Sequence, residues 1–253
     1  MTRRITLATA ILVFIISMNG VGLISGYAND IMPAQDRSTT VIWEIKQTPE
    51  TAFESFWTGG GYWLADESSH MTFSVGDIEE DVTGGLTLGN MTVIANDTMI
   101  ARDLALGVWG IVEFSPGLFI KIGSNDIAQL NATAFEAVER VKWNYLNGTM
   151  VSYYDNYTIG TTEYECIFFE YQQDSGIIVT AQHTKLVYNL SNGILLYGNT
   201  SYFFGSPSHP YNFEIEFFRI QHSGTMPNPL PVYVIAFTAV ILVIIIIKLR
   251  QRK

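Results

Sequence analysis

Cysteine is almost absent from the sequence, since Cys166 is the only one in 253 residues. A single cysteine cannot form an internal disulfide, which excludes the disulfide-stapled scaffolds common among secreted animal domains. It lies in the apolar run Tyr164–Phe169 without a flanking nucleophile motif. We therefore expect Cys166 to be a small buried side chain in a strand rather than a catalytic thiol.

Basic residues are scarce in the middle of the chain. Six of the 14 Lys and Arg lie in the two terminal segments, whereas all 24 Asp and Glu fall between Asp30 and Glu216. This central part has eight basic and 24 acidic residues, a formal charge of −16. Nucleic acids and anionic lipid headgroups bind basic surfaces, so we exclude both as its partners.

Known catalytic and cofactor motifs are also missing. The chain has no GxSxG elbow, P-loop, GxGxxG or HExxH, and its four histidines lack zinc-ligand spacing. We predict no enzyme activity and no cofactor. The acidic side chains of Asp77, Glu79 and Asp81 are a candidate Ca²⁺ site, but the segment lacks the EF-hand glycine and distal glutamate. That lack favours a solvated acidic turn.

The N-terminus carries an apolar run next to basic residues. Arg3 and Arg4 precede Ile5–Ile24, and small residues follow up to Ala28. This pattern predicts a secretory signal peptide over residues 1–28. An uncleaved N-terminal anchor is the alternative, because the apolar run is long.

The C-terminus has a second uncharged apolar run, residues 232–247, with four basic residues in the last six of the chain. It predicts a transmembrane helix whose basic end is cytoplasmic; a buried core segment is the alternative. The predicted order is a signal peptide over 1–28, an external domain over 29–226, a Pro-rich linker over 227–231, a transmembrane helix over 232–249 and a tail over 250–253.

N-glycosylation sequons are abundant. The 14 Asn and 39 Ser plus Thr would give about two Asn-x-Ser/Thr triplets by chance, but seven are present. All lie in the predicted external domain, where glycan transfer takes place. Sequons without disulfides favour an archaeal cell surface. The acceptors are Asn90, Asn96, Asn131, Asn147, Asn156, Asn189 and Asn199.

The external domain is predicted to be mainly β, in the α+β class, with an antiparallel sheet and one packing helix. Short turn signals separate the segments of a C-terminal five-strand meander. The helix is expected over 132–143, with a capping box at Thr133 and a Glu136–Arg140 pair. The meander strands are expected at 149–159, 162–172, 177–188, 194–204 and 211–221, and earlier strands at 41–45, 71–75, 86–94 and 110–122.

The predicted hairpin around Asn192-Gly193 carries both sequon asparagines and core residues, so its register decides whether they lie on separate faces of the sheet. A tight Asn192-Gly193 turn would place Asn189 and Asn199 on opposite faces of the sheet. A three-residue loop with a left-handed Gly193 would place both on one face, with Leu186, Tyr188 and Leu196 on the other. We predict the bulged turn, because burial of the apolar face sets the register.

The segments MTFSVGDI, GIVEFSPGLFIKIG, CIFFEYQQ and LVYNLSNGILL, with the sequons and the terminal anchor, carry a family likeness. The chain resembles archaeal, chiefly Asgard, surface proteins grouped as the choice-of-anchor S family. The likeness covers most of residues 40–222. It implies an exported domain held to the membrane by interchangeable anchors, and it transfers no functional site.

These patterns predict a single-pass, membrane-anchored, N-glycosylated cell-surface protein with its large domain outside. Its partners would be the lipid bilayer, the N-linked glycans and another surface protein. The alternative is a binding protein for a lipid or other apolar ligand between a curved sheet and the helix. The aromatic residues would then line a cavity, whereas in the first interpretation they fill a sheet core.

Overall fold

The computed structural model describes residues 39–49, 53–54, 62–79, 81–108, 114–143, 147–174, 181–202 and 211–222. They belong to one compact unit within Ile31–Lys253. The predicted signal peptide, linker, transmembrane helix and tail lie outside the described residues. Within those ranges, no helix combines the length and apolar character needed to cross a bilayer.

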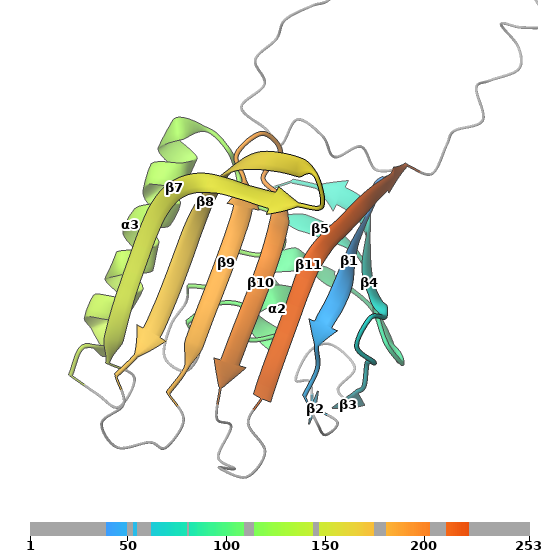
Figure 1. The fold of residues 1–253 in the computed structure, drawn as a ribbon, viewed down its shortest axis with the longest axis horizontal. Helices are drawn as coiled ribbons and strands as arrows, with labels where there is room; N and C mark the ends of the chain where they lie inside the picture. The colour runs from blue at the N-terminus through green and yellow to red at the C-terminus, as the bar shows by residue number, and fades with distance from the viewer. Residues whose placement is uncertain are drawn as a thin grey trace, which may run out of the picture. The chain divides into compact units, whose positions relative to one another are not determined.

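Nine strands form one antiparallel sheet in the order β6-β5-β4-β1-β11-β10-β9-β8-β7 (Figure 1). A separate two-stranded pair joins β2 to β3. The strands are β1 (Thr39–Gln47), β2 (Phe53–Glu54), β3 (Tyr62–Trp63), β4 (His70–Ile78), β5 (Val82–Leu88), β6 (Met91–Asn96), β7 (Gly148–Ile159), β8 (Thr162–Gln173), β9 (His183–Asn189), β10 (Leu195–Tyr202) and β11 (Tyr211–His222).

The predicted C-terminal meander is confirmed, because β7 to β11 pair in chain order. β7 and β8 agree with the predicted bounds to within one residue. The described residues 181 and 182 precede β9, which begins at His183, whereas residues 175–180 lie outside the described ranges. Short turns between β-rich segments were therefore sufficient to predict this half of the sheet.

Two upstream strand predictions were wrong. The segment 86–94 is split between β5 and β6 by a turn at Gly89-Asn90, where Gly89 has a φ of +55°. The described part of 110–122 makes only isolated bridges, including Phe119 with Ile194. Its apolar residues are buried against the sheet instead of forming a full strand.

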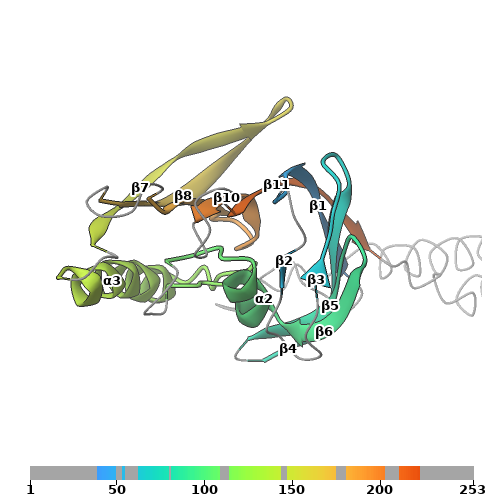
Figure 2. The same cartoon turned by 90° about the horizontal axis from the view of Figure 1, so that it is seen from below.

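Two helices connect the opposite edges of the sheet. The chain leaves edge strand β6, forms α2 (Asp97–Asp103) and α3 (Ser124–Val141), and enters edge strand β7. Both helices lie on the concave side of the curved sheet (Figure 2). We call the opposite side the outer face. Helix α2 was not predicted, because seven residues are too few for a clear helical period.

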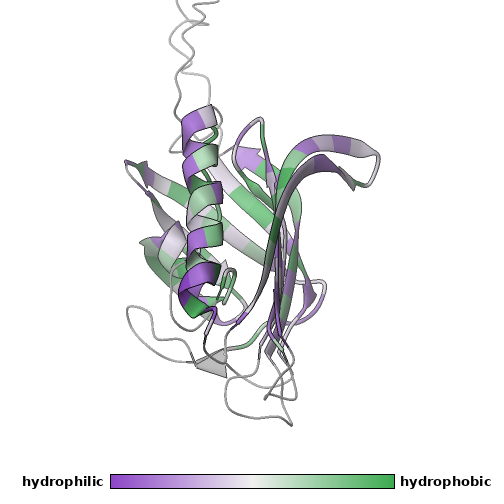
Figure 3. Cartoon of the chain, turned by 90° about the vertical axis from the view of Figure 1, so that its left-hand side faces the viewer, coloured by the Kyte–Doolittle hydropathy of each residue, from purple (hydrophilic) through white to green (hydrophobic). Residues whose placement is uncertain are grey.

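Helix α3 begins eight residues before the predicted start. Its buried side chains, Ile127, Ala134, Ala137 and Val141, form one stripe, and the polar and apolar bands alternate along it (Figure 3). The capping box was wrong: Thr133 Oγ1 donates to the Gln129 carbonyl at 3.0 Å within the helix. The Glu136–Arg140 pair is confirmed at 3.7 Å.

The main core lies between the concave face and the segment that contains the helices. Trp43 of β1 is fully buried, and its Nε1 donates to the Leu195 carbonyl at 2.6 Å. The Phe119 ring packs against Trp43 and Phe73, with centroid distances of 6.2 and 5.5 Å. Bulges in β1, β4 and β10 interrupt the ladders and bend the strands, which helps the sheet curve around this core.

The β9–β10 hairpin confirms the predicted shared face. Gly193 is left-handed, with a φ of +72°, and Asn199 pairs with Lys185. Asn189 and Asn199 therefore both lie on the outer face, whereas Leu186 belongs to the main core.

The predicted loop length was wrong. Asn189 N–H donates to the Ile194 carbonyl at 3.0 Å, and Gly193 N–H donates to the Asn189 carbonyl at 2.8 Å. These bonds enclose a loop of four residues instead of three. A bulge at Leu196 then restores the predicted register and turns this side chain to the outer face, although we expected it in the core.

Candidate functional site

The distal end of the β7–β8 hairpin folds over the outer face of the sheet (Figures 1 and 2). β8 pairs with β9 only from Cys166 onward, so residues 155–165 extend beyond that pairing. A second apolar cluster lies here, separate from the main core. Its buried members are Cys166, Phe168, Val187 and Leu196, and its partly buried members include Tyr153, Tyr157 and Phe217.

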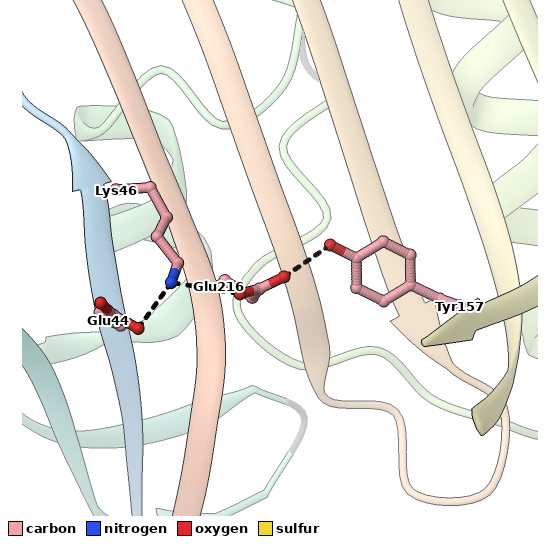
Figure 4. Close-up of polar contacts among 4 residues, drawn as sticks. All are labelled: Glu44, Lys46, Tyr157 and Glu216. Carbon is pink, nitrogen blue, oxygen red and sulfur yellow. Dashed lines mark hydrogen bonds and ion pairs between the residues drawn. The ribbon is translucent and has the colours of Figure 1, made fainter. Parts of the chain in front are cut away.

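A polar network links the folded hairpin to the opposite half of the sheet (Figure 4). Tyr157 of β7 donates to Glu216 Oε1 of β11 at 2.9 Å. Glu216 Oε2 lies 3.3 Å from Lys46 Nζ, which also contacts Glu44 at 2.6 Å. The hydrogen bonds to Glu44 and then Glu216 raise the pKa of Lys46. Both ion pairs are partly exposed, so each contributes at most about 1 kcal/mol.

Cys166 has the buried position that the sequence predicted. It is 1% exposed, and burial raises the pKa of its thiol to about 11. The reactive thiolate is therefore scarce at neutral pH. The arrangement suits a packing residue in the outer cluster and does not suit a nucleophile.

The sequon asparagines differ in accessibility. Asn189 is only 3% exposed, and its Oδ1 accepts hydrogen bonds from Ser191 N–H and Oγ, both at 2.8 Å. Asn131 follows Ile127 on the buried stripe of α3, and its Oδ1 is buried without a partner. In this folded structure a glycan on Asn189 has no room. The other six are at least partly exposed: Asn90, Asn96, Asn131, Asn147, Asn156 and Asn199.

Four of these six acceptors share a contact, since each donates from Nδ2 to a carboxylate. An N-linked glycan replaces one of the two Nδ2 hydrogens, so each amide keeps one donor after modification. The local contact and a glycan are therefore chemically compatible. The pairs are Asn96 with Asp81 at 2.6 Å, Asn147 with Asp174 at 2.5 Å, Asn156 with Glu163 at 3.0 Å and Asn199 with Glu214 at 2.8 Å.

The candidate calcium ligands lie around one opening at the β4–β5 turn. Asp77, Glu79 and Asp81 line a pocket of about 320 Å³ together with Thr83 and Asn96. Asp81 already accepts a hydrogen bond from Asn96. Across the described part of the chain, no three His, Cys, Asp or Glu side chains converge to hold a metal ion. The three carboxylates thus share an opening without forming a ligand set.

A second open pocket, of about 310 Å³, lies between α3, the first turn of α2 and the segment before α3. Charged side chains line it, among them Asp81, Asp97, Lys121 and Asp126. Asp97 lines this pocket and is 2% exposed. Burial raises the pKa of Asp97 to about 7, although hydrogen bonds from the backbone of Phe119 and Val82 lower it.

Both carboxylate oxygens of Asp97 hold the backbone of other segments. Oδ1 accepts from Val82 N–H at 3.2 Å, and Oδ2 accepts from Phe119 N–H at 3.1 Å. A β-carbon on Gly117, whose φ is +98°, would lie 2.3 Å from Oδ2. Asp97 therefore joins β5, α2 and the segment before α3, and its oxygens are not free to act as a general base.

Sequence reasoning found neither Asp97 nor the Tyr157–Glu216 contact. The Asn96-Asp97-Thr98 triplet has the sequon pattern, yet Asn96 also caps α2 by accepting from Met99 N–H at 3.0 Å. An N-cap residue followed by an acidic residue in the first turn is a signal for a helix start. The Tyr157–Glu216 contact has no local signal, because 59 residues separate its members.

Comparison of the chain with protein-family models, with curated proteins and with solved structures found no match. The sequence resemblance to archaeal surface proteins therefore stays a prediction.

Proposed function

We propose that this chain is a single-pass, membrane-anchored, N-glycosylated cell-surface protein of the archaeal type. In this proposal the β-rich external domain serves surface interaction or envelope structure and is not an enzyme. The transmembrane helix over 232–249 would hold it in the bilayer, with the N-linked glycans on its outside.

The observation that supports this proposal is the position of the sequons in the fold. Six of the seven acceptor asparagines are at least partly exposed, at turns, at strand ends, on strands or on helix α3. A glycan at these positions leaves the main core undisturbed. An acidic domain with several solvent-facing acceptors fits the outside of a cell, where glycan transfer takes place.

The pocket beside α3 and a crevice under the sheet do not favour the apolar-ligand alternative. The 310 Å³ pocket beside α3 is lined by carboxylates and a lysine, which suit polar contents. A narrow crevice between the sheet and the segment that contains the helices, lined by Met150, Phe169 and Leu186 among others, has no room for a water molecule. A lipid chain needs an apolar cavity of about 300 Å³ or more.

Mass spectrometry of the full chain purified from membranes tests the proposal. We expect loss of residues 1–28, glycan masses on the exposed sequons, and membrane retention in alkaline carbonate. A matched variant with Lys substituted for Val240 and Ile241 should lose retention, because charges at the centre of a span oppose insertion. A chain that keeps Met1, carries no glycan and is released by carbonate would refute the proposal.

A further inference from the structure

The sheet is open and has two edges, β6 and β7. In the part of the chain that the structure describes, β6 pairs only with β5, and β7 pairs only with β8. Each edge strand therefore presents backbone groups with which another strand could pair at a spacing of about 4.8 Å. β7 is also long, with 12 residues.

Neither edge strand carries the residues that usually prevent such pairing. β6 reads MTVIAN and β7 reads GTMVSYYDNYTI, so the two strands contain no Lys, Arg or Pro and one acidic residue, Asp155. Large side chains are instead exposed on both: Ile94 on β6 at 78%, and Val151 and Tyr154 on β7 at 47% and 66%. An uncharged edge of this kind favours association between sheets.

Four of the six sequons with a partly exposed asparagine lie on these two strands or directly next to them. Asn90 is in the turn before β6, and Asn96 is its last residue. Asn147 immediately precedes β7, and Asn156 lies within it. The two acceptors are about six residues apart on the β6 edge and about nine apart on the β7 edge. At about 3.3 Å per residue, the distance between the two acceptors covers most of the length of each edge strand.

We propose that the N-glycans on Asn90, Asn96, Asn147 and Asn156 protect the sheet edges and keep the domain from pairing with a second copy of itself. A bulky hydrophilic glycan rooted at both ends of β6, and before and within β7, occupies the space that an added strand needs. This inference rests on the proposed glycosylation, and it gives four sequons a specific physical role.

The test removes the edge glycans and leaves the asparagines in place. The substitutions Thr92→Ala, Thr98→Ala, Thr149→Ala and Thr158→Ala destroy the four edge sequons. Ser201→Ala destroys the Asn199 sequon on interior strand β10 and serves as the matched control for Thr158→Ala, because Asn199 and Asn156 each donate to a glutamate. Thr158→Ser keeps the sequon and controls for the change at that position.

The readout is the mass of the full chain in detergent, measured by multi-angle light scattering, with glycan occupancy checked by intact mass. We expect the wild type, Thr158→Ser and Ser201→Ala to be monomeric. The mass of the fourfold edge variant should at least double, because one isologous pairing of two copies already doubles it. Adding Ile94→Lys and Val151→Lys to it should restore the monomer, because lysine on an edge opposes strand addition.

Three outcomes would overturn the inference. The fourfold variant could lose its glycans and remain monomeric, the lysine substitutions could fail to separate the associated species, or Ser201→Ala could associate as strongly. Each of these outcomes leaves the proposed surface function intact, since the wild-type chain would still carry its glycans. A wild-type chain without any glycan would contradict both proposals, and intact mass separates that case from the others.

Discussion

Substitution of Gly193 tests whether the segment before α3 is fastened to the β9–β10 turn. Gly193 has a φ of +72°, and an added β-carbon would lie 2.0 Å from the Ile120 carbonyl oxygen. Ile120 N–H donates to the Gly193 carbonyl at 2.8 Å, and Leu195 N–H donates to the Leu118 carbonyl at 2.9 Å. Gly193→Ala should therefore force this segment away from the turn.

Gly160→Ala is the matched control, because Gly160 has a similar φ of +61° and nothing within 4 Å of its added β-carbon. A left-handed alanine costs about 1–2 kcal/mol, which both variants share. Displacing the segment also weakens two backbone hydrogen bonds, at about 1–3 kcal/mol for each group left buried and unpaired. We expect the free energy of unfolding to fall by about 1–2 kcal/mol in Gly160→Ala and by about 3–8 kcal/mol in Gly193→Ala.

Equilibrium urea unfolding of the full chain, followed by tryptophan fluorescence, measures this difference. The two variants should share one m-value with the wild type and differ in midpoint. Hydrogen exchange of the Ile120 and Leu195 amides gives a second readout, since both should lose protection only in Gly193→Ala. Equal destabilisation of the two variants, with both amides still protected, would refute the conclusion that the segment before α3 is fastened to the β9–β10 turn.

Three further predictions concern the site residues. Burial raises the pKa of Asp97 to about 7, so its protonated form stabilises the fold below about pH 4, and this contribution is lost as the pH rises through about 7, at up to about 1.4 kcal/mol per pH unit. Urea unfolding of Asp97→Asn should lack this pH dependence of the free energy of unfolding. Parallel pH profiles for the wild type and Asp97→Asn would contradict the prediction. Tyr157→Phe should cost about 0.5–1.5 kcal/mol and speed hydrogen exchange in residues 155–165, whereas unchanged exchange would show that Glu216 does not hold the hairpin. Glycopeptide mapping should find Asn199 occupied and Asn189 empty in folded protein; the reverse would contradict the buried position of Asn189.

The sequence predicted the elements whose pattern is local. The strands of the meander are β-rich segments joined by short turns, so their order and antiparallel pairing follow from neighbouring residues. The left-handed Gly193 and the shared face of Asn189 and Asn199 also followed, because strand parity depends only on residue spacing.

The predictions failed where burial or packing at long range determines the structure. The apolar segment around Phe119 resembles a strand because it is buried, not because it pairs along its length. The start of α3 was missed because polar residues open the helix and Asn131 interrupts its apolar stripe. Asp97 was missed because its partners, Val82 and Phe119, are 15 and 22 residues away.

Strand parity predicts the face of the sheet on which a side chain lies, but it does not predict whether that side chain is buried. Asn189 and Asn199 share the outer face, yet Asn189 is buried, since β8 runs beside it and Leu190 N–H donates to the Glu165 carbonyl at 2.9 Å. The folded hairpin thus divides one face into a covered part and an open part. A glycan on Asn189 would need space that this folded structure does not leave, because the side chain is only 3% exposed. The sequons on the two edges face no such conflict, because no strand of the described chain lies beyond them.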